Sequence, residues 1–89
     1  MINQQLGINK VIFTFNVTSI KKAIDVFSFM NSERLKRFCF KADFETSYVI
    51  EENKDNSVTF NINILYGDAS IDTNKKIVSK IRDKINSLL

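Results

Sequence analysis

Residues 58–66 have the sequence Val58-Thr59-Phe60-Asn61-Ile62-Asn63-Ile64-Leu65-Tyr66. Large apolar residues occupy every second position, and mostly polar residues lie between them. Because successive side chains of a strand point to opposite faces, this alternation predicts a β-strand with one buried face. We therefore expect Phe60, Ile62 and Ile64 to face the core. The polar residues between them should face water or a partner.

A second alternating stretch comes before this strand and predicts its hairpin partner. Apolar and polar residues alternate over 44–51, and the polar residues 52–56 follow as a turn. Two alternating stretches joined by a short polar loop are typical of a β-hairpin. An earlier strand segment near 37–41 stays open as an alternative, because Phe38 and Phe40 also alternate with less apolar neighbours.

The N-terminal part of the chain contains a third alternating stretch. Residues 10–17 place Val11, Phe13, Phe15 and Val17 on one face, which predicts another strand with one buried side. Residues 1–9 are polar and aperiodic. We expect them to form a short flexible tail in front of a single domain over 10–89.

Two further segments have the spacing of amphipathic helices. Residues 19–30 place apolar side chains three and four positions apart, with a hydroxyl N-cap from Thr18-Ser19 and a stop at Asn31. Ser32 is expected to cap a further short turn over 33–35. The last helix is expected over 72–88, and it begins at a cap formed by Asp72 or Thr73.

These elements predict an α+β fold in the order β-α-β-β-α. A two-layer sandwich, with two helices packed on one face of a small and mostly antiparallel sheet, buries both apolar helix faces. The expected core contains Phe13, Phe15, Ile24, Phe27, Phe60, Ile62, Ile64, Ile77, Ile81 and Ile85.

The composition removes most of the groups that enzymes use. The chain has no histidine and no proline, two glycines and one cysteine, Cys39. Nucleophilic triads and zinc sites need histidine or several cysteines, so we predict no catalytic residues, no metal site and no cofactor. Cys39 is expected to be a small buried hydrophobic residue. Asp68 and Asp72 could share Mg²⁺, although a turn and a helix cap are the commoner roles of aspartate there.

Charge is distributed unevenly although the net charge is only +3. Residues 43–55 hold five acidic residues and one lysine, whereas residues 75–84 hold five basic residues and one aspartate. Opposite potentials are therefore expected at two parts of the surface. The candidate partner-binding residues are Lys75, Lys76, Lys80, Arg82, Lys84, Glu51, Glu52 and Asp55. The alternative is that the lysine row is an ordinary solvated helix face.

No apolar run approaches the roughly 20 residues of a membrane span, and the N-terminal residues lack the order of a signal peptide. A cytosolic protein without a transmembrane segment is therefore expected. A peripheral association with a membrane would come through a partner.

The C-terminal third carries a family resemblance. Residues 58–67 end in Tyr66-Gly67, and a short link then leads to a helix with Ile77, Ile81 and Ile85. This segment resembles the alkaline shock/Gls-type envelope stress-response family. The resemblance implies a non-enzymatic protein that self-associates or docks on other proteins near the membrane, with no catalytic residues.

A non-enzymatic module for protein interaction or self-association is the leading functional hypothesis, with a second copy or an acidic protein as partner. The strand over 10–17 or over 44–51 could also offer an open sheet edge. The alternative is an RNA- or ribosome-associated domain that uses the basic last helix. Against nucleic acid, no aromatic residue is interleaved with the basic residues of that helix.

Overall fold

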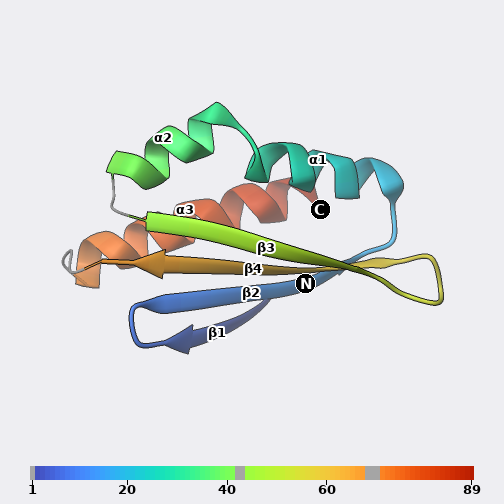
Figure 1. The fold of residues 1–89 in the computed structure, drawn as a ribbon, viewed down its shortest axis with the longest axis horizontal. Coiled ribbons are helices and arrows are strands. Elements are labelled where there is room, and N and C mark those ends of the chain that lie inside the picture. The colour runs from blue at the N-terminus through green and yellow to red at the C-terminus, as the bar shows by residue number, and fades with distance from the viewer. Residues whose placement is uncertain (1, 42–43, 68–70) are drawn as a thin grey trace.

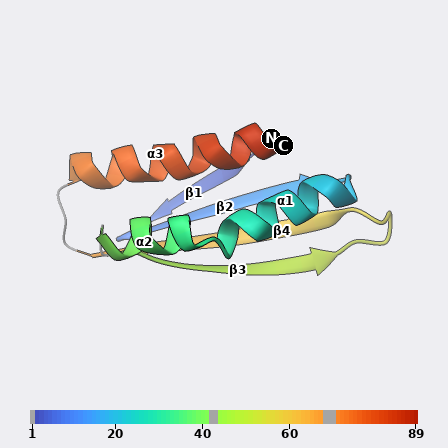
Figure 2. The same ribbon diagram turned by 90° about the horizontal axis from the view of Figure 1, so that it is seen from above.

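An antiparallel sheet forms one layer of the fold, and helices cover one of its faces (Figures 1 and 2). The computed structural model describes residues 2–41, 44–67 and 71–89. Within them the sheet has four strands in the order β1-β2-β4-β3. The elements in chain order are β1 (Asn3–Gly7), β2 (Lys10–Val17), α1 (Ile20–Met30), α2 (Glu33–Lys41), β3 (Phe44–Glu52), β4 (Val58–Tyr66) and α3 (Ile71–Leu88).

The predicted fold class is confirmed: this is an α+β fold with helices on one face of a small antiparallel sheet. The predicted elements occur in the predicted order, and β1 and α2 are additional. The sequence predicted a flexible tail where β1 lies. Where α2 lies, it predicted a short turn and left a strand open as an alternative.

Register in the sheet follows the alternation of apolar residues. Strands β2 and β4 pair antiparallel, with Phe15 opposite Phe60 and Phe13 opposite Ile62. The rings of Phe15 and Phe60 stack with centroids 5.3 Å apart. All four side chains are buried under the helices, so the core predicted for β2 and β4 is confirmed.

Residues 3–7 form a strand, and the expected flexible tail over 1–9 is wrong for this segment. Strand β1 pairs along its whole length with β2, from Asn3 opposite Thr14 to Gly7 opposite Lys10. Every β1 side chain is exposed. Because the strand is held by backbone pairing and buries no side chain, its sequence carries no apolar alternation that could have predicted it.

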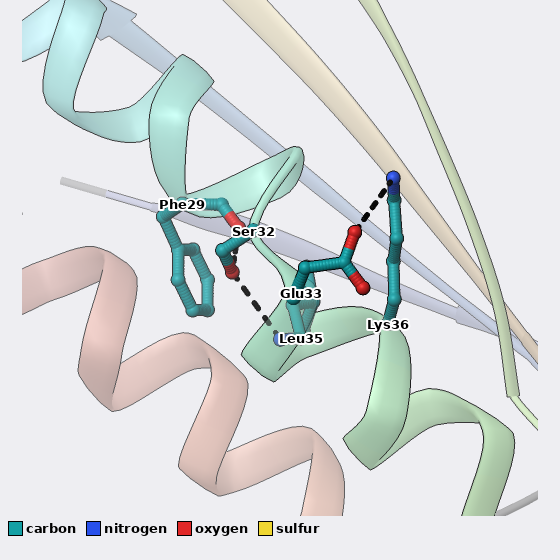
Figure 3. Close-up of polar contacts among 5 residues, drawn as sticks. All are labelled: Phe29, Ser32, Glu33, Leu35 and Lys36. Atoms are coloured by element: carbon teal, nitrogen blue, oxygen red, sulfur yellow. Dashed lines mark hydrogen bonds and ion pairs between the residues drawn. The ribbon is translucent and has the colours of Figure 1, made fainter.

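The open alternative of a strand near 37–41 is also wrong, since these residues continue helix α2. Ser32 begins this helix: its Oγ accepts a hydrogen bond from the Leu35 amide at 3.2 Å (Figure 3). Leu35 and Cys39 are buried four residues apart, on the helix face that meets the core. The predicted burial of Cys39 is confirmed, although it lies on a helix.

Helix α1 has the predicted caps, but it presents a different face to the core. The Ser19 side chain accepts from the Lys22 amide, and Asn31 ends the helix. Val26 and Met30 are buried, whereas Ile24 and Phe27 are 57% and 47% exposed. The expectation that Ile24 and Phe27 belong to the core is therefore wrong, because the helix is rotated toward its Val26 side.

Helix α3 begins at Ile71, one residue before its predicted start, and packs Val78, Ile81 and Ile85 into the core. Ile77, also expected in the core, is only partly buried against it. From above, α3 lies on the side of β1, while α1 and α2 lie toward β3 (Figure 2). Asp68, one of the two aspartates considered for Mg²⁺, lies outside the described residues.

Candidate functional site

The charged residues predicted from the sequence lie at different ends of the molecule. Glu51, Glu52 and Asp55 surround the hairpin between β3 and β4, at one end of the longest axis, which spans 41 Å (Figure 1). Lys75 and Lys76 lie near the start of α3, at the other end (Figure 1). All five side chains are exposed.

A hollow of about 910 Å³ separates α2 from α3. We call it the cationic groove; its lining residues are Phe29, Glu33, Arg34, Leu35, Arg37, Lys80, Ile81 and Lys84. Apolar side chains from α1, α2 and α3 contribute to the lining, together with cations from both α2 and α3. The groove is therefore amphipathic, and it brings Lys80 and Lys84 together with two arginines.

The junction of α1 and α2 positions one wall of this groove. Ser32 Oγ donates a hydrogen bond to the Phe29 carbonyl oxygen at 2.7 Å and accepts one from the Leu35 amide (Figure 3). The Phe29 ring points toward α3, as Figure 3 shows. A single serine thus satisfies a carbonyl in the last turn of α1 and caps the start of α2.

The electrostatics of the cationic groove are one-sided. Arg34, Arg37, Lys80 and Lys84 are exposed, and Glu33 is the single carboxylate among the lining residues that the structure describes. Glu33 lies 3.9 Å from Lys36, a residue outside the lining. No ion pair within the described residues neutralises any of the four lining cations. The groove consequently attracts anions.

Three predicted basic residues do not contribute to this groove. Arg82 Nη1 donates to Gln4 Oε1 of β1 at 3.2 Å, and its Nε lies 3.8 Å from the Asp83 carboxylate. Arg82 thus connects α3 to the edge strand. Lys75 and Lys76 are exposed on α3 but do not line the hollow. The structure divides the predicted basic row into two lysines that line the groove, an arginine that contacts β1, and two exposed lysines outside the groove.

Sequence reasoning missed Arg34 and Arg37, because it treated residues 33–35 as a short turn and left a strand near 37–41 open as an alternative. The signal that could have found them is the spacing of Leu35 and Cys39, two residues of apolar character four positions apart. On a helix with that buried face, Arg34 and Arg37 remain exposed.

The acidic end is ordered by hydrogen bonds in the hairpin turn. Asp55 Oδ1 accepts from the Ser57 hydroxyl at 2.5 Å and from the Ser57 amide at 3.1 Å. These two hydrogen bonds hold the pKa of the Asp55 carboxyl below its ordinary value. Asp55 therefore has a structural role in the turn as well as its charge.

A second surface lies along the opposite flank of α1. The exposed apolar residues Ile20, Ile24 and Phe27 of α1 line a hollow of about 240 Å³ together with Ile50 of β3. We call these four residues the apolar edge patch. Phe27 contacts Tyr48 of β3 edge to face, with ring centroids 6.0 Å apart. The patch therefore adjoins the outer edge of the sheet.

Comparison of the chain with protein-family models, with curated proteins and with solved structures found no match. The resemblance to the alkaline shock/Gls-type family therefore stays a prediction.

Burial raises the pKa of the Cys39 thiol, and a hydrogen bond with Thr46 acts in the opposite direction. Within the described ranges, no helix combines the length and the apolarity that crossing a bilayer requires.

Proposed function

We propose that the protein is a non-enzymatic interaction module whose cationic groove binds an acidic segment of a protein partner. The observation that carries this proposal is the pairing of Arg34 and Arg37 on one wall with Lys80 and Lys84 on the other, over the apolar side chains of the lining. A ligand that satisfies both features has carboxylates on its flanks and an apolar face.

An amphipathic helix with an acidic polar side has this chemistry. Helices of this kind bind in hydrophobic grooves through apolar residues repeated at three and four positions. The half-buried Phe29 would contact the apolar face of such a helix, and the cations would contact its carboxylates on both sides. Because the cations lie on two walls, they can contact several carboxylates along a peptide segment, whereas a single lipid headgroup would contact only some of them.

RNA fits the groove less well. RNA-recognition sheets stack bases on exposed aromatic side chains. The uncovered sheet face of this protein presents Ile12, Thr14, Asn61, Asn63 and Leu65 from its two central strands, and none of these is aromatic. A cytoplasmic location and a role in the envelope stress response, both inferred from the sequence, belong to the same proposal.

The first experiment measures binding of a fluorescent amphipathic peptide of about 18 residues with leucine on one face and glutamate on the other. We expect the peptide to bind and its affinity to fall steeply with salt, because the contact involves several charges. The variant Lys80→Glu with Lys84→Glu should weaken binding by more than about tenfold, through lost attraction and added repulsion.

The matched control is Lys75→Glu with Lys76→Glu, which makes the same change of charge on the same helix outside the groove. An equal loss of affinity in both variants would show diffuse charge attraction and would contradict the groove. A peptide of the same pattern with lysine in place of glutamate should not bind. Tighter binding of a single-stranded RNA than of the acidic peptide would favour the RNA-associated alternative.

A further inference from the structure

The outer edge of β3 is open along nine residues. In the described part of the chain, β3 pairs with β4 on one side and with no strand on the other. The strand over 10–17 was also considered for an open edge, and this is wrong because β2 lies between β1 and β4. An unpaired edge of this length presents backbone donors and acceptors that another strand can pair with.

The apolar edge patch faces the same side of the molecule. On α1, Phe29 lines the cationic groove toward α3, whereas Phe27 contacts Tyr48 of β3 on the other flank. Asn31 Nδ2 also donates to the Tyr48 hydroxyl at 2.9 Å, which ties the end of α1 to this strand. Ile20, Ile24 and Phe27 are 79%, 57% and 47% exposed, so a large apolar flank beside the open edge has no cover.

We propose that a second copy of this chain covers both features, through antiparallel pairing of β3 with β3 around a two-fold axis. Such an axis brings the same edge and the same patch from both copies together, as an isologous interface requires. A single added strand from another protein would pair with the edge but would leave the α1 flank uncovered. This inference goes beyond the proposed function, because it uses neither wall of the cationic groove.

The charges of β3 argue against one register of this pairing. An axis through Tyr48 would place Glu45 of one copy directly opposite Glu51 of the other, and like charges in opposite positions are destabilising. An axis through Val49 avoids this, because Glu51 then meets Ser47. It also places Ile50 of one copy opposite Tyr48 of the other, a favourable pair of a β-branched and an aromatic residue. We therefore assign the axis to Val49.

The first test is the mass of the full-length chain in solution, measured by sedimentation equilibrium over a wide range of concentration. We expect a dimer, and we expect Ile24→Glu to raise its dissociation constant by about a hundredfold, because a carboxylate would be placed in an apolar interface. The matched control is Leu65→Glu, which changes an apolar residue of similar exposure on the uncovered sheet face. It should leave the dimer unchanged.

The second test is the register. Val49→Cys should form a disulfide-linked dimer under mild oxidation, since the two cysteines would face each other at the axis. Leu65→Cys should not form a disulfide-linked dimer, and neither should the unaltered chain, because its Cys39 is buried. Circular dichroism confirms that each variant is folded. A monomeric wild-type chain, a dimer insensitive to Ile24→Glu, or a dimer without the Val49→Cys disulfide would each overturn the proposal.

Discussion

Asp55 and Ser57 show how a single side chain stabilises the β3–β4 hairpin. Asn56 adopts a left-handed backbone with φ of 67°, a conformation that asparagine tolerates better than most residues. Ser57 is buried, and its hydroxyl and amide both donate to the Asp55 carboxylate. The hairpin turn thus depends on an ionised carboxylate at the tip of the molecule.

This arrangement predicts a pH dependence. The Asp55 pKa is lower in the folded chain than in the unfolded chain, so its contribution to stability is complete above the unfolded pKa of about 3.9. The contribution is lost as the pH falls through the folded value. Asp55→Asn should lower the thermal midpoint at neutral pH, and the difference from wild type should shrink below the folded pKa.

Thermal melts of both chains between neutral pH and pH 2 measure this effect. The control is Glu52→Gln, which removes one negative charge from the end of the same strand, where the side chain is exposed. An Asp55→Asn chain whose deficit stays constant over the whole pH range would show that the hydrogen bonds to Ser57 do not depend on the carboxylate charge.

At the scale of single elements, the apolar residues of α1 cover more of the helix surface than the sheet can bury, so they face three different parts of the molecule. Val26 and Met30 face the sheet, Phe29 faces α3, and Ile24 and Phe27 face the edge of β3. Helical spacing identified all of these positions as apolar. It does not determine which third of a wide arc meets the sheet.

The rotation of α1 can be tested by two truncations on the same helix. Val26→Ala should lower the free energy of unfolding by about 1–3 kcal/mol, because Val26 is completely buried and its loss leaves a cavity. Ile24→Ala should cost less than about 1 kcal/mol in the monomer, since its side chain is already more than half exposed. Chemical denaturation at low protein concentration measures both.

If both variants lost the same free energy of unfolding, Val26 would not be buried more deeply than Ile24. A larger loss in Ile24→Ala would show that Ile24, and not Val26, faces the core. The low protein concentration matters, because any dimer formed through the apolar edge patch would add to the apparent stability of the chain with Ile24 intact.

The other elements differ in how much of them could be predicted. Strands β2, β3 and β4 were predicted within one residue, because apolar and polar residues alternate in each over eight or nine residues. Strand β1 and most of α2 were missed. Strand β1 has no buried side chain, and α2 is a short helix whose phenylalanines mimic alternation. Strand β1 thus carries no local pattern, whereas α2 carries a helical one in the spacing of Leu35 and Cys39, which the alternating phenylalanines obscured.

At the scale of the whole molecule, the two proposed surfaces lie on opposite flanks of α1. The cationic groove lies between α2 and α3, and the apolar edge patch lies beside β3. Figure 2 shows α3 and β3 on opposite sides of α1. Because the two surfaces share no residue, their functions should be separable. One copy could bind an acidic segment while its β3 edge pairs with a second copy.

This separation predicts additive behaviour. Lys80→Glu with Lys84→Glu should abolish peptide binding and leave the dimer dissociation constant within about twofold. Ile24→Glu should raise the dimer dissociation constant and leave the affinity for the peptide unchanged. The combined variant should show both losses without further coupling. Peptide titration and sedimentation on the same samples measure both quantities. A loss of peptide affinity in Ile24→Glu would instead show that the groove is complete only in the dimer.

The sequence by itself determined the class of the fold, the three longer strands, the two longer helices and the division of charge between hairpin and last helix. Each of these depends on the period of apolar residues or on composition, which are local properties. Only the tertiary structure decided which flank of α1 is buried, that Arg34 and Arg37 line one groove with Lys80 and Lys84, and that β3 is the long open edge. Those outcomes depend on packing between segments distant in the chain, and no local pattern encodes the order of strands or the direction in which one helix leaves another.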